Sequence, residues 1–272
     1  MAEPNRIDVR FADQAANGRK SLWPYVTAGL PDVETTGAIL RALDAIGVGG
    51  VEVGIPFSDS IADGPVIQTS FARALDGGVA AEAIFEMVRS ARREVSLPLI
   101  AMVSFSIVYR RGVGDYLAAA ADAGFDGLIV PDLSLEEAPS IAEAAEAAGL
   151  RVVMLVAPTT PPERQERIAR LSGGFVYYMS VAGITGERTG VPPELAGNVR
   201  RLRAAAGKPV AVGFGIARPE HVAAVCEVAD AAIVGSAIVR RILEQIDAGA
   251  GRDAVVESVR AFADELQAPL KG

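Results

Sequence analysis

The sequence predicts a (β/α)8 barrel, and two patterns along the chain indicate it. Short apolar runs alternate with amphipathic, alanine-rich runs from end to end, and a helix follows each predicted strand, which is typical of a parallel sheet. Eight such units in 272 residues, with no antiparallel segment, favour a closed barrel over an open doubly wound sheet. We therefore expect one domain, residues 1–272.

The expected strands are short runs rich in β-branched and other apolar residues. They lie at Leu22–Ala28, Val51–Gly54, Leu97–Val103, Gly127–Val130, Arg151–Val156, Phe175–Ser180, Pro209–Gly213 and Ala231–Val234. The helical patterns between them span Val33–Ile46, Ala80–Val95, Asp115–Ala123, Leu135–Ala148, Pro162–Leu171, Pro193–Ala206, Pro219–Glu227 and Ser236–Ala248. Additional helices are expected near the N-terminus, at Arg6–Asn17, and near the C-terminus, at Arg252–Leu266.

The connections differ at the two ends of the predicted strands. Four helical patterns end in a glycine, at Gly47, Gly124, Gly149 and Gly207, where a left-handed residue would stop a helix and make a tight turn. The connections that follow the strands are longer and more varied, notably at 55–64 and 181–191. Because barrel enzymes carry their chemistry on strand-to-helix loops, we expect function at that face.

Composition narrows the classes of partner and cofactor. The net charge of −8 and the pI near 4.9 argue against nucleic-acid or anionic membrane partners, which need clustered Lys and Arg. Cys226, the one cysteine, cannot form an intramolecular disulfide, and no zinc-like Cys/His spacing occurs, so no metal is expected. The polar N-terminus and the lack of a long apolar run predict a cytoplasmic protein.

A glutamate interrupts the second predicted strand. Glu52 lies between Val51 and Val53, and Asp59 and Asp63 follow in a Gly/Pro-rich loop. A carboxylate in an apolar strand must be hydrogen-bonded, exposed at the strand end, or held at a raised pKa. The pattern indicates an acid/base site, although a solvated or ion-paired Glu52 fits the residues alone as well.

Small residues gather after the last three predicted strands. They form Gly183-Ile184-Thr185-Gly186, Gly213-Phe214-Gly215 and Gly235-Ser236, the last of these opening a helix. Each by itself is more often a turn than a site. Together, their backbone N–H groups and the Ser236 hydroxyl would converge on a phosphate-sized anion in a barrel.

Several of these motifs together resemble the tryptophan synthase alpha subunit family over about Phe11–Ala263. The resemblance lies in Gly50–Asp59 followed by Ala62-Asp63-Gly64-Pro65, and in Pro24–Gly29, Val130–Leu133, Gly183–Gly186 and Val212–Ile216. It implies a (β/α)8 barrel that cleaves indole-3-glycerol phosphate to indole and glyceraldehyde 3-phosphate in tryptophan biosynthesis, without a cofactor. It also implies a pyridoxal-phosphate-dependent beta subunit as partner, in an alpha2beta2 complex.

The same resemblance assigns roles to particular residues. Glu52 matches the catalytic glutamate, which carries protons, and Asp63 matches the catalytic aspartate, which accepts a hydrogen bond from the indole N–H. Tyr177 and Thr185 are expected to contact the substrate, Thr185 from a loop that closes over it. The phosphate is expected at Gly186, Gly213, Gly215, Gly235 and Ser236. Asp59 is expected to shape its loop or to couple to the partner.

Other conspicuous residues are given structural interpretations. His221 has no nucleophile or ligand set nearby in the pattern, so we expect it on the solvated surface. Cys226 and Trp23 are expected in or near the core. The serines lack a Gly-x-Ser-x-Gly elbow, which gives serine hydrolase chemistry no support.

Three positions depart from the family pattern, at Ser60, Ser106 and Ser134. They fall on the loops after the second, third and fourth strands, which the family uses to dock the beta subunit. A stand-alone indole-releasing lyase and a non-catalytic allosteric or binding subunit therefore remain alternatives. The enzymatic alternatives are indoleglycerol-phosphate synthase and phosphoribosyl isomerases, although no strand here ends in the lysine that the synthase would need.

Overall fold

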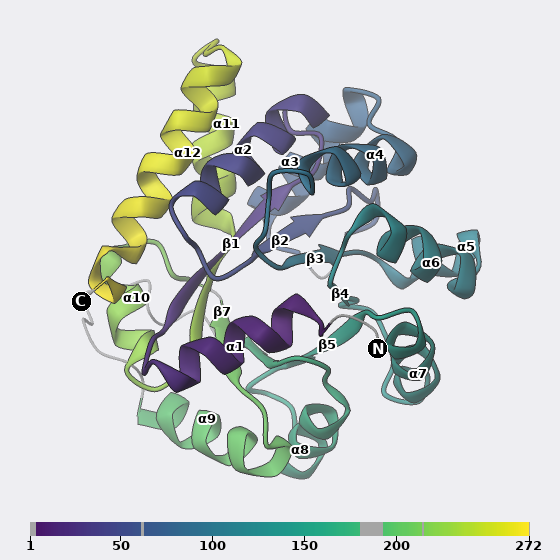
Figure 1. Cartoon of the computed structure of the whole chain (residues 1–272), viewed down its shortest axis with the longest axis vertical. Coiled ribbons are helices and arrows are strands. Elements are labelled where there is room, and N and C mark those ends of the chain that lie inside the picture. Colours follow the sequence, from purple (N-terminus) through teal and green to yellow (C-terminus); the bar gives the residue numbers. More distant parts are fainter. Residues whose placement is uncertain (1–3, 61–62, 180–192, 214, 272) are drawn as a thin grey trace.

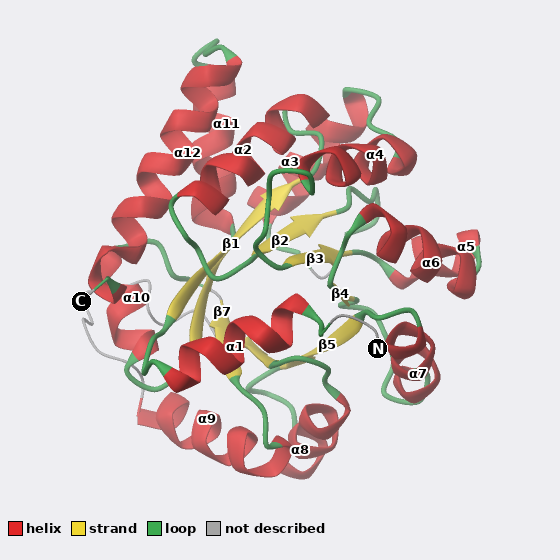
Figure 2. Ribbon diagram, in the orientation of Figure 1, coloured by secondary structure: helices red, strands yellow, loops and turns green. Residues whose placement is uncertain are grey.

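Eight parallel strands close into a barrel in the computed structural model, which describes residues 4–60, 63–179, 193–213 and 215–271. The strands are β1 (Ser21–Thr27), β2 (Val51–Gly54), β3 (Leu99–Met102), β4 (Gly127–Ile129), β5 (Arg151–Val156), β6 (Val176–Met179), β7 (Val210–Gly213) and β8 (Ala231–Val234). Each pairs with the next, and β8 pairs with β1. Helices surround this sheet in Figures 1 and 2. The predicted (β/α)8 barrel is confirmed.

The helices match the predicted pattern, with two additions. They are α1 (Arg6–Ala16), α2 (Val33–Ala45), α3 (Pro65–Asp76), α4 (Ala81–Ala91), α5 (Phe105–Arg111), α6 (Val113–Ala123), α7 (Ala138–Ala147), α8 (Pro162–Leu171), α9 (Pro193–Ala206), α10 (Pro219–Cys226), α11 (Ser236–Asp247) and α12 (Arg252–Gln267), then a short 3-10 helix, Ala268–Leu270. The sequence prediction lacked α3 and α5. Both begin on the loops after β2 and β3, next to the predicted site.

The tight turns are as predicted. Gly47, Gly124, Gly149 and Gly207 have φ angles of 74°, 98°, 81° and 62°. Only glycine adopts this left-handed conformation without steric cost, so each residue reverses the chain directly after a helix. These turns lead into the strands at the end of the barrel away from the longer loops.

Strand register turns Glu52 toward the barrel interior. Glu52 pairs with Tyr25 on β1 and with Ile100 on β3. Ile100 belongs to the apolar cluster that fills the barrel, together with Ile129, Val153, Phe175, Tyr177, Ala211, Ala231 and Ile233. Because side chains at paired positions face the same side of a sheet, the Glu52 carboxyl group enters this apolar interior.

Aromatic side chains close the N-terminal end of the barrel. The rings of Phe11, Trp23 and Phe175 lie with their centroids 5.2–5.4 Å apart. Phe11 comes from α1, which crosses this end of the strands in front of the barrel in Figure 1, and Ile7 of the same helix is fully buried. The predicted core position of Trp23 is confirmed, with no exposed surface.

His221 corrects the sequence prediction, because it is buried rather than solvated. Its side chain is 8% exposed and lies on α10 with Val222, Val225 and Cys226, which are also buried. The Ala217 N–H donates to its Nδ1 atom at 3.4 Å, so the ring packs beneath the loop after β7. Burial, and then the charge of Arg218, lower its pKa. The predicted burial of Cys226 is confirmed.

The described residues lack two features, a membrane-spanning helix and a metal-binding cluster. None of their helices is long and apolar enough to cross a membrane. Nor do they include a group of three or more His, Cys, Asp or Glu side chains that could hold a metal ion. The cytoplasmic location expected from the sequence stays a prediction.

Candidate active site

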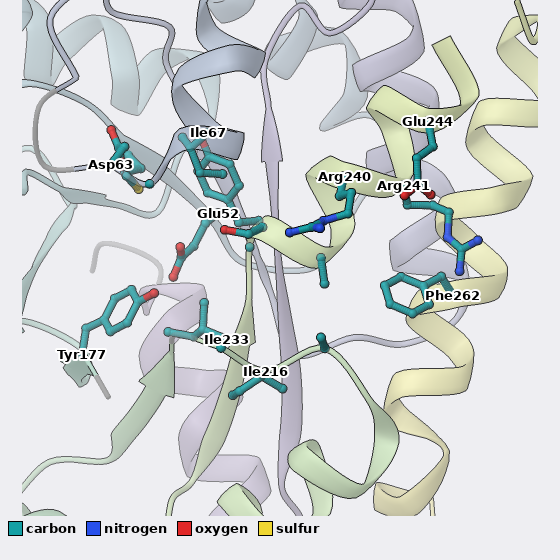
Figure 3. Close-up of a pocket in the computed structure, with 18 residues that line it drawn as sticks. Glu52, Asp63, Ile67, Tyr177, Ile216, Ile233, Arg240, Arg241, Glu244 and Phe262 are labelled. Carbon is teal, nitrogen blue, oxygen red and sulfur yellow. The ribbon is translucent and has the colours of Figure 1, made fainter. Parts of the chain in front are cut away.

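A cavity of about 700 Å³ opens at the carboxyl ends of the strands. Its described lining comes from β1, β2, β3, β6 and β8, from the loops after β2, β7 and β8, and from α3, α11 and α12. These residues are Tyr25, Glu52, Asp63, Gly64, Ile67, Met102, Tyr177, Gly215–Ala217, Ile233, Gly235–Ala237, Arg240, Arg241, Glu244 and Phe262. Figure 3 shows the two predicted catalytic carboxyl groups on one side of this cavity.

Glu52 is a buried carboxyl group without a protein partner in the described structure. The residue is 1% exposed, and its Oε1 atom accepts no hydrogen bond from any described residue. Burial raises the pKa of Glu52 to about 8, because the anion is poorly solvated among apolar neighbours. The group is therefore mostly protonated at neutral pH, yet it titrates within a physiological range. That combination suits a group that both gives and takes protons.

Asp63 lies on the same side of the cavity as Glu52, in the loop after β2 (Figure 3). Its backbone N–H donates to the Ser60 carbonyl at 3.1 Å, shortly before α3 begins. Burial, and then the charge of Asp132, raise the pKa of Asp63 to about 6. The two carboxyl groups thus differ in charge between about pH 6 and pH 8, with Asp63 ionised and Glu52 protonated.

Two tyrosines form the inner walls of the cavity, and each occupies space left by a glycine. A Cβ atom at Gly54 would overlap the Tyr25 hydroxyl, and one at Gly213 would overlap the Tyr177 hydroxyl. Burial raises the pKa of both tyrosines, and the charges of Glu52 and Asp63 raise it further, so both phenols are neutral. Tyr177 lines this cavity, and its contact with the substrate stays a prediction. Tyr25 was missed, since an aromatic residue in an apolar strand is usually core.

Gly215, from the loop after β7, lines the same cavity as Gly235 and Ser236, which open α11. Gly213 is not among the described lining residues, because the Tyr177 ring covers it. Thr185 and Gly186 lie outside the described residues. The buried His221 supports the loop after β7 through its contact with Ala217.

Sequence reasoning also missed four residues at the outer end, namely Arg240, Arg241, Glu244 and Phe262. Helical spacing offered a signal for Arg240, which follows Ser236 by one turn.

A second cavity of about 530 Å³ adjoins the first and shares Asp63 and Met102 with it. Asp132, after β4, joins two loops there: it accepts hydrogen bonds from the Ser104 hydroxyl (2.7 Å) and from the Phe105 N–H (2.8 Å). The remaining described lining is Ile55, Phe57, Asp59, Ser60, Phe71, Val103, Ser106 and Pro131. The described parts of the loops after β2, β3 and β4 therefore line one cavity beside Asp63.

The three serines that the sequence analysis singled out lie in different surroundings on these loops. Ser60 and Ser106 line the second cavity. Ser134 lies apart from it, and its hydroxyl donates to Glu137 at 2.7 Å while accepting from the Glu137 N–H at 3.1 Å. The Asp59 carboxylate accepts a hydrogen bond from Ser58 (3.1 Å), as a residue that shapes its own loop would.

Comparison with known proteins decides the family. The model of the family described as tryptophan synthase alpha chain matches residues 11–270. The chain belongs to the tryptophan synthase alpha chain family. A family member from Thermosynechococcus vestitus is 44% identical over 266 residues, which cover 97% of this chain and 98% of that protein.

Solved structures of the tryptophan synthase alpha chain family agree. The crystal structure of the alpha subunit from Legionella pneumophila has a TM-score of 0.88 at 34% identity, with 98% of each chain covered. A chain of the tryptophan synthase complex from Pyrococcus furiosus has a TM-score of 0.81 at 39% identity, covering 91% of this chain and 98% of that one. Membership of this family argues against the other phosphate-handling barrels, indoleglycerol-phosphate synthase and phosphoribosyl isomerases, that the sequence left open.

Proposed function

We infer that this chain is a lyase that cleaves indole-3-glycerol phosphate to indole and glyceraldehyde 3-phosphate, in tryptophan biosynthesis. The observation that carries the inference is a buried Glu52 carboxyl group, without a partner among the described residues, that shares one cavity with Asp63 in a chain of the tryptophan synthase alpha family. A buried acid with a pKa near neutrality and a second, more acidic carboxylate are the groups that this cleavage needs.

The proposed mechanism assigns one role to each carboxyl group. Protonated Glu52 gives its proton to indole C3, and ionised Asp63 accepts a hydrogen bond from the ring N–H, which stabilises the positive charge on the ring nitrogen. The glycerol hydroxyl next to C3 then loses its proton to the Glu52 carboxylate as the carbon–carbon bond breaks. The bonding electrons return to the ring, which releases indole, and the former hydroxyl carbon becomes the aldehyde. Glu52 ends protonated, as it began.

The phosphate is assigned to the end of the cavity next to α11. Gly215, Gly235 and Ser236 line this cavity, and Ser236 is the first residue of the helix. Free backbone N–H groups at a helix N-terminus attract anions. We assign Gly213 a supporting part, through Tyr177. By resemblance only, we add Gly186 to the phosphate site and keep Thr185 as a substrate contact.

A direct assay of indole release tests this function. The purified chain should release indole from indole-3-glycerol phosphate, and the rate should fall strongly in variants of Glu52 and of Asp63. No release by the wild-type chain, alone or with a beta subunit present, would instead favour the non-catalytic alternative.

We expect kcat/KM to depend on pH as a bell. The rate should rise as Asp63 ionises near pH 6 and fall as Glu52 loses its proton near pH 8, because the first step needs an ionised Asp63 and a protonated Glu52. A pH–rate profile of indole release measures both limbs. A flat profile between pH 5 and pH 9 would contradict the assignment.

The Asp132→Asn variant tests whether the acid and alkaline limbs of the pH–rate profile belong to different groups. Since the charge of Asp132 helps to raise the pKa of Asp63, its removal should move the acid limb to lower pH. The alkaline limb should stay in place, because burial alone raises the pKa of Glu52. A shift of both limbs together would mean that the substitution had disturbed the whole site.

We propose a pyridoxal-phosphate-dependent tryptophan synthase beta subunit as the partner. The chain resembles part of the Pyrococcus furiosus tryptophan synthase complex. The surface formed by the loops after β2, β3 and β4 is the proposed docking face. Next to Ser106, the α5 residue Tyr109 is 73% exposed, which suits a ring that a partner covers.

When the purified chain is mixed with a purified beta subunit, we expect a stable complex and faster indole release. Tyr109→Ser should weaken the complex, while Val9→Ser should not, because Val9 is an exposed apolar residue on α1 at the opposite end of the barrel. Analytical ultracentrifugation measures both. If no complex forms although the chain releases indole, the stand-alone lyase is the correct alternative.

A further inference from the structure

Two adjacent arginines on α11 line the outer part of the catalytic cavity. Arg240 and Arg241 are the two positively charged side chains among its described lining residues. Arg240 follows Ser236 by four residues, so both lie on the same face of the helix. Helical side chains lean toward the N-terminus of their helix, which brings a long side chain at Arg240 back over the turn that begins at Ser236.

The two side chains point in different directions. In Figure 3, Arg240 extends toward the side of the cavity where Glu52 lies, whereas Arg241 extends away from it toward α12. The Arg241 guanidinium lies over the Phe262 ring, 4.8 Å from its centroid. No ion pair within the described structure includes either arginine, although Glu244 lines the same outer end. Arg240 itself is exposed, and no described acidic side chain holds its guanidinium.

The charge of the substrate creates a need for such a group. A phosphate ester brings close to two negative charges into a protein of net charge −8, into a cavity that already holds the ionised Asp63. The backbone N–H groups at the start of α11 offer only partial positive charge. A guanidinium supplies a full charge and two parallel N–H donors that match two phosphate oxygens.

We propose that Arg240 is a positioning residue that holds the substrate phosphate against the N-terminus of α11. This inference rests on the proposed function and extends it. Arg240 lies at the phosphate end rather than among the reacting groups, so it sets how tightly and in what register the substrate binds. Arg241, held against Phe262, takes no part.

A pair of charge-matched variants tests this in the full-length chain. Arg240→Gln should raise KM for indole-3-glycerol phosphate, and the dissociation constant of inorganic phosphate, by about 10- to 100-fold, as expected for a lost charge-assisted contact. The value of kcat should change by less than about fivefold, because the interaction is the same in ground state and transition state. Arg241→Gln removes the same charge and should stay within about twofold of wild type. Arg240→Lys should recover part of the lost affinity, since lysine keeps the positive charge but not the two parallel N–H donors.

Phosphate binding and indole release are measured separately, so that the role of Arg240 and the proposed function can fail independently. Calorimetric titration with inorganic phosphate needs no turnover, so it decides the role of Arg240 even if the wild-type chain releases no indole. Equal phosphate affinities in Arg240→Gln and Arg241→Gln would overturn the inference. Failure of indole release with an intact Arg240-dependent phosphate site would overturn the proposed function alone.

Discussion

Glu52→Gln is expected to lower kcat for indole release by about 10²- to 10⁴-fold, the usual contribution of a general acid–base group. Glutamine has the shape of the glutamic acid but cannot give a proton to indole C3 or take one from the glycerol hydroxyl. KM should change little, because the carboxyl group is proposed to act on the reacting atoms. Steady-state kinetics with a sensitive indole assay measures both constants.

The matched control is Glu244→Gln, the same chemical change at the outer end of the same cavity. It should keep kcat within about threefold of wild type, as substitutions away from the reacting atoms usually do. Equal activity of Glu52→Gln and wild type would show that the proton carrier is another group.

Glu52→Gln should not be less stable than wild type. The folded-state pKa of about 8 lies above the ordinary value of 4.5, so between these values the folded chain holds a proton that the unfolded chain has released. The stability contributed by protonated Glu52 is complete below about pH 4.5 and is lost as the pH rises to about 8. Glutamine does not titrate, and Glu52→Gln should remove this part of the pH dependence in chemical denaturation.

Asp63→Asn is expected to lower kcat by about 10²- to 10³-fold, the effect of removing one group that stabilises charge in a transition state. An amide oxygen still accepts a hydrogen bond from the ring N–H but no longer offers a negative charge to the cation. The acid limb near pH 6 should disappear from the pH–rate profile at the same time. Loss of rate with an unchanged acid limb would assign that limb to a different group.

Asp59→Asn provides the comparison for this second variant. Asp59 belongs to the same loop and lines only the neighbouring cavity, where it accepts a hydrogen bond from Ser58. We expect a change in kcat of less than about threefold for the isolated chain. A loss as large as that of Asp63→Asn would mean that the shape of the loop, not the charge of Asp63, controls the rate.

The sequence predicted the barrel and the position of Glu52 because both depend on local patterns. Strand and helix periods repeat along the whole chain, and a glutamate between Val51 and Val53 is conspicuous in any apolar strand. Glycines after helices also have a local meaning, and all four that we singled out have positive φ.

What the sequence missed depends on contacts between distant segments. Nothing local distinguishes Tyr25, a cavity wall, from a core tyrosine, or shows that the Tyr177 ring covers Gly213. The local sequence suggests a surface position for His221, because the loop after β7 that covers it is recognised only in the folded chain. Arg240 reaches the cavity only because α11 runs past its rim. In each case, tertiary packing gives the residue its role.

The closed N-terminal end of the barrel lets the stability of the fold be changed separately from the turnover of the enzyme. The Phe11, Trp23 and Phe175 rings and the overlying α1 contribute to folding from the end opposite the carboxyl groups. Heat resistance could therefore be engineered by repacking this floor while turnover is left unchanged. Trp23 is also the one tryptophan of the chain, so its emission would follow unfolding of the floor and remain insensitive to occupancy of the catalytic end.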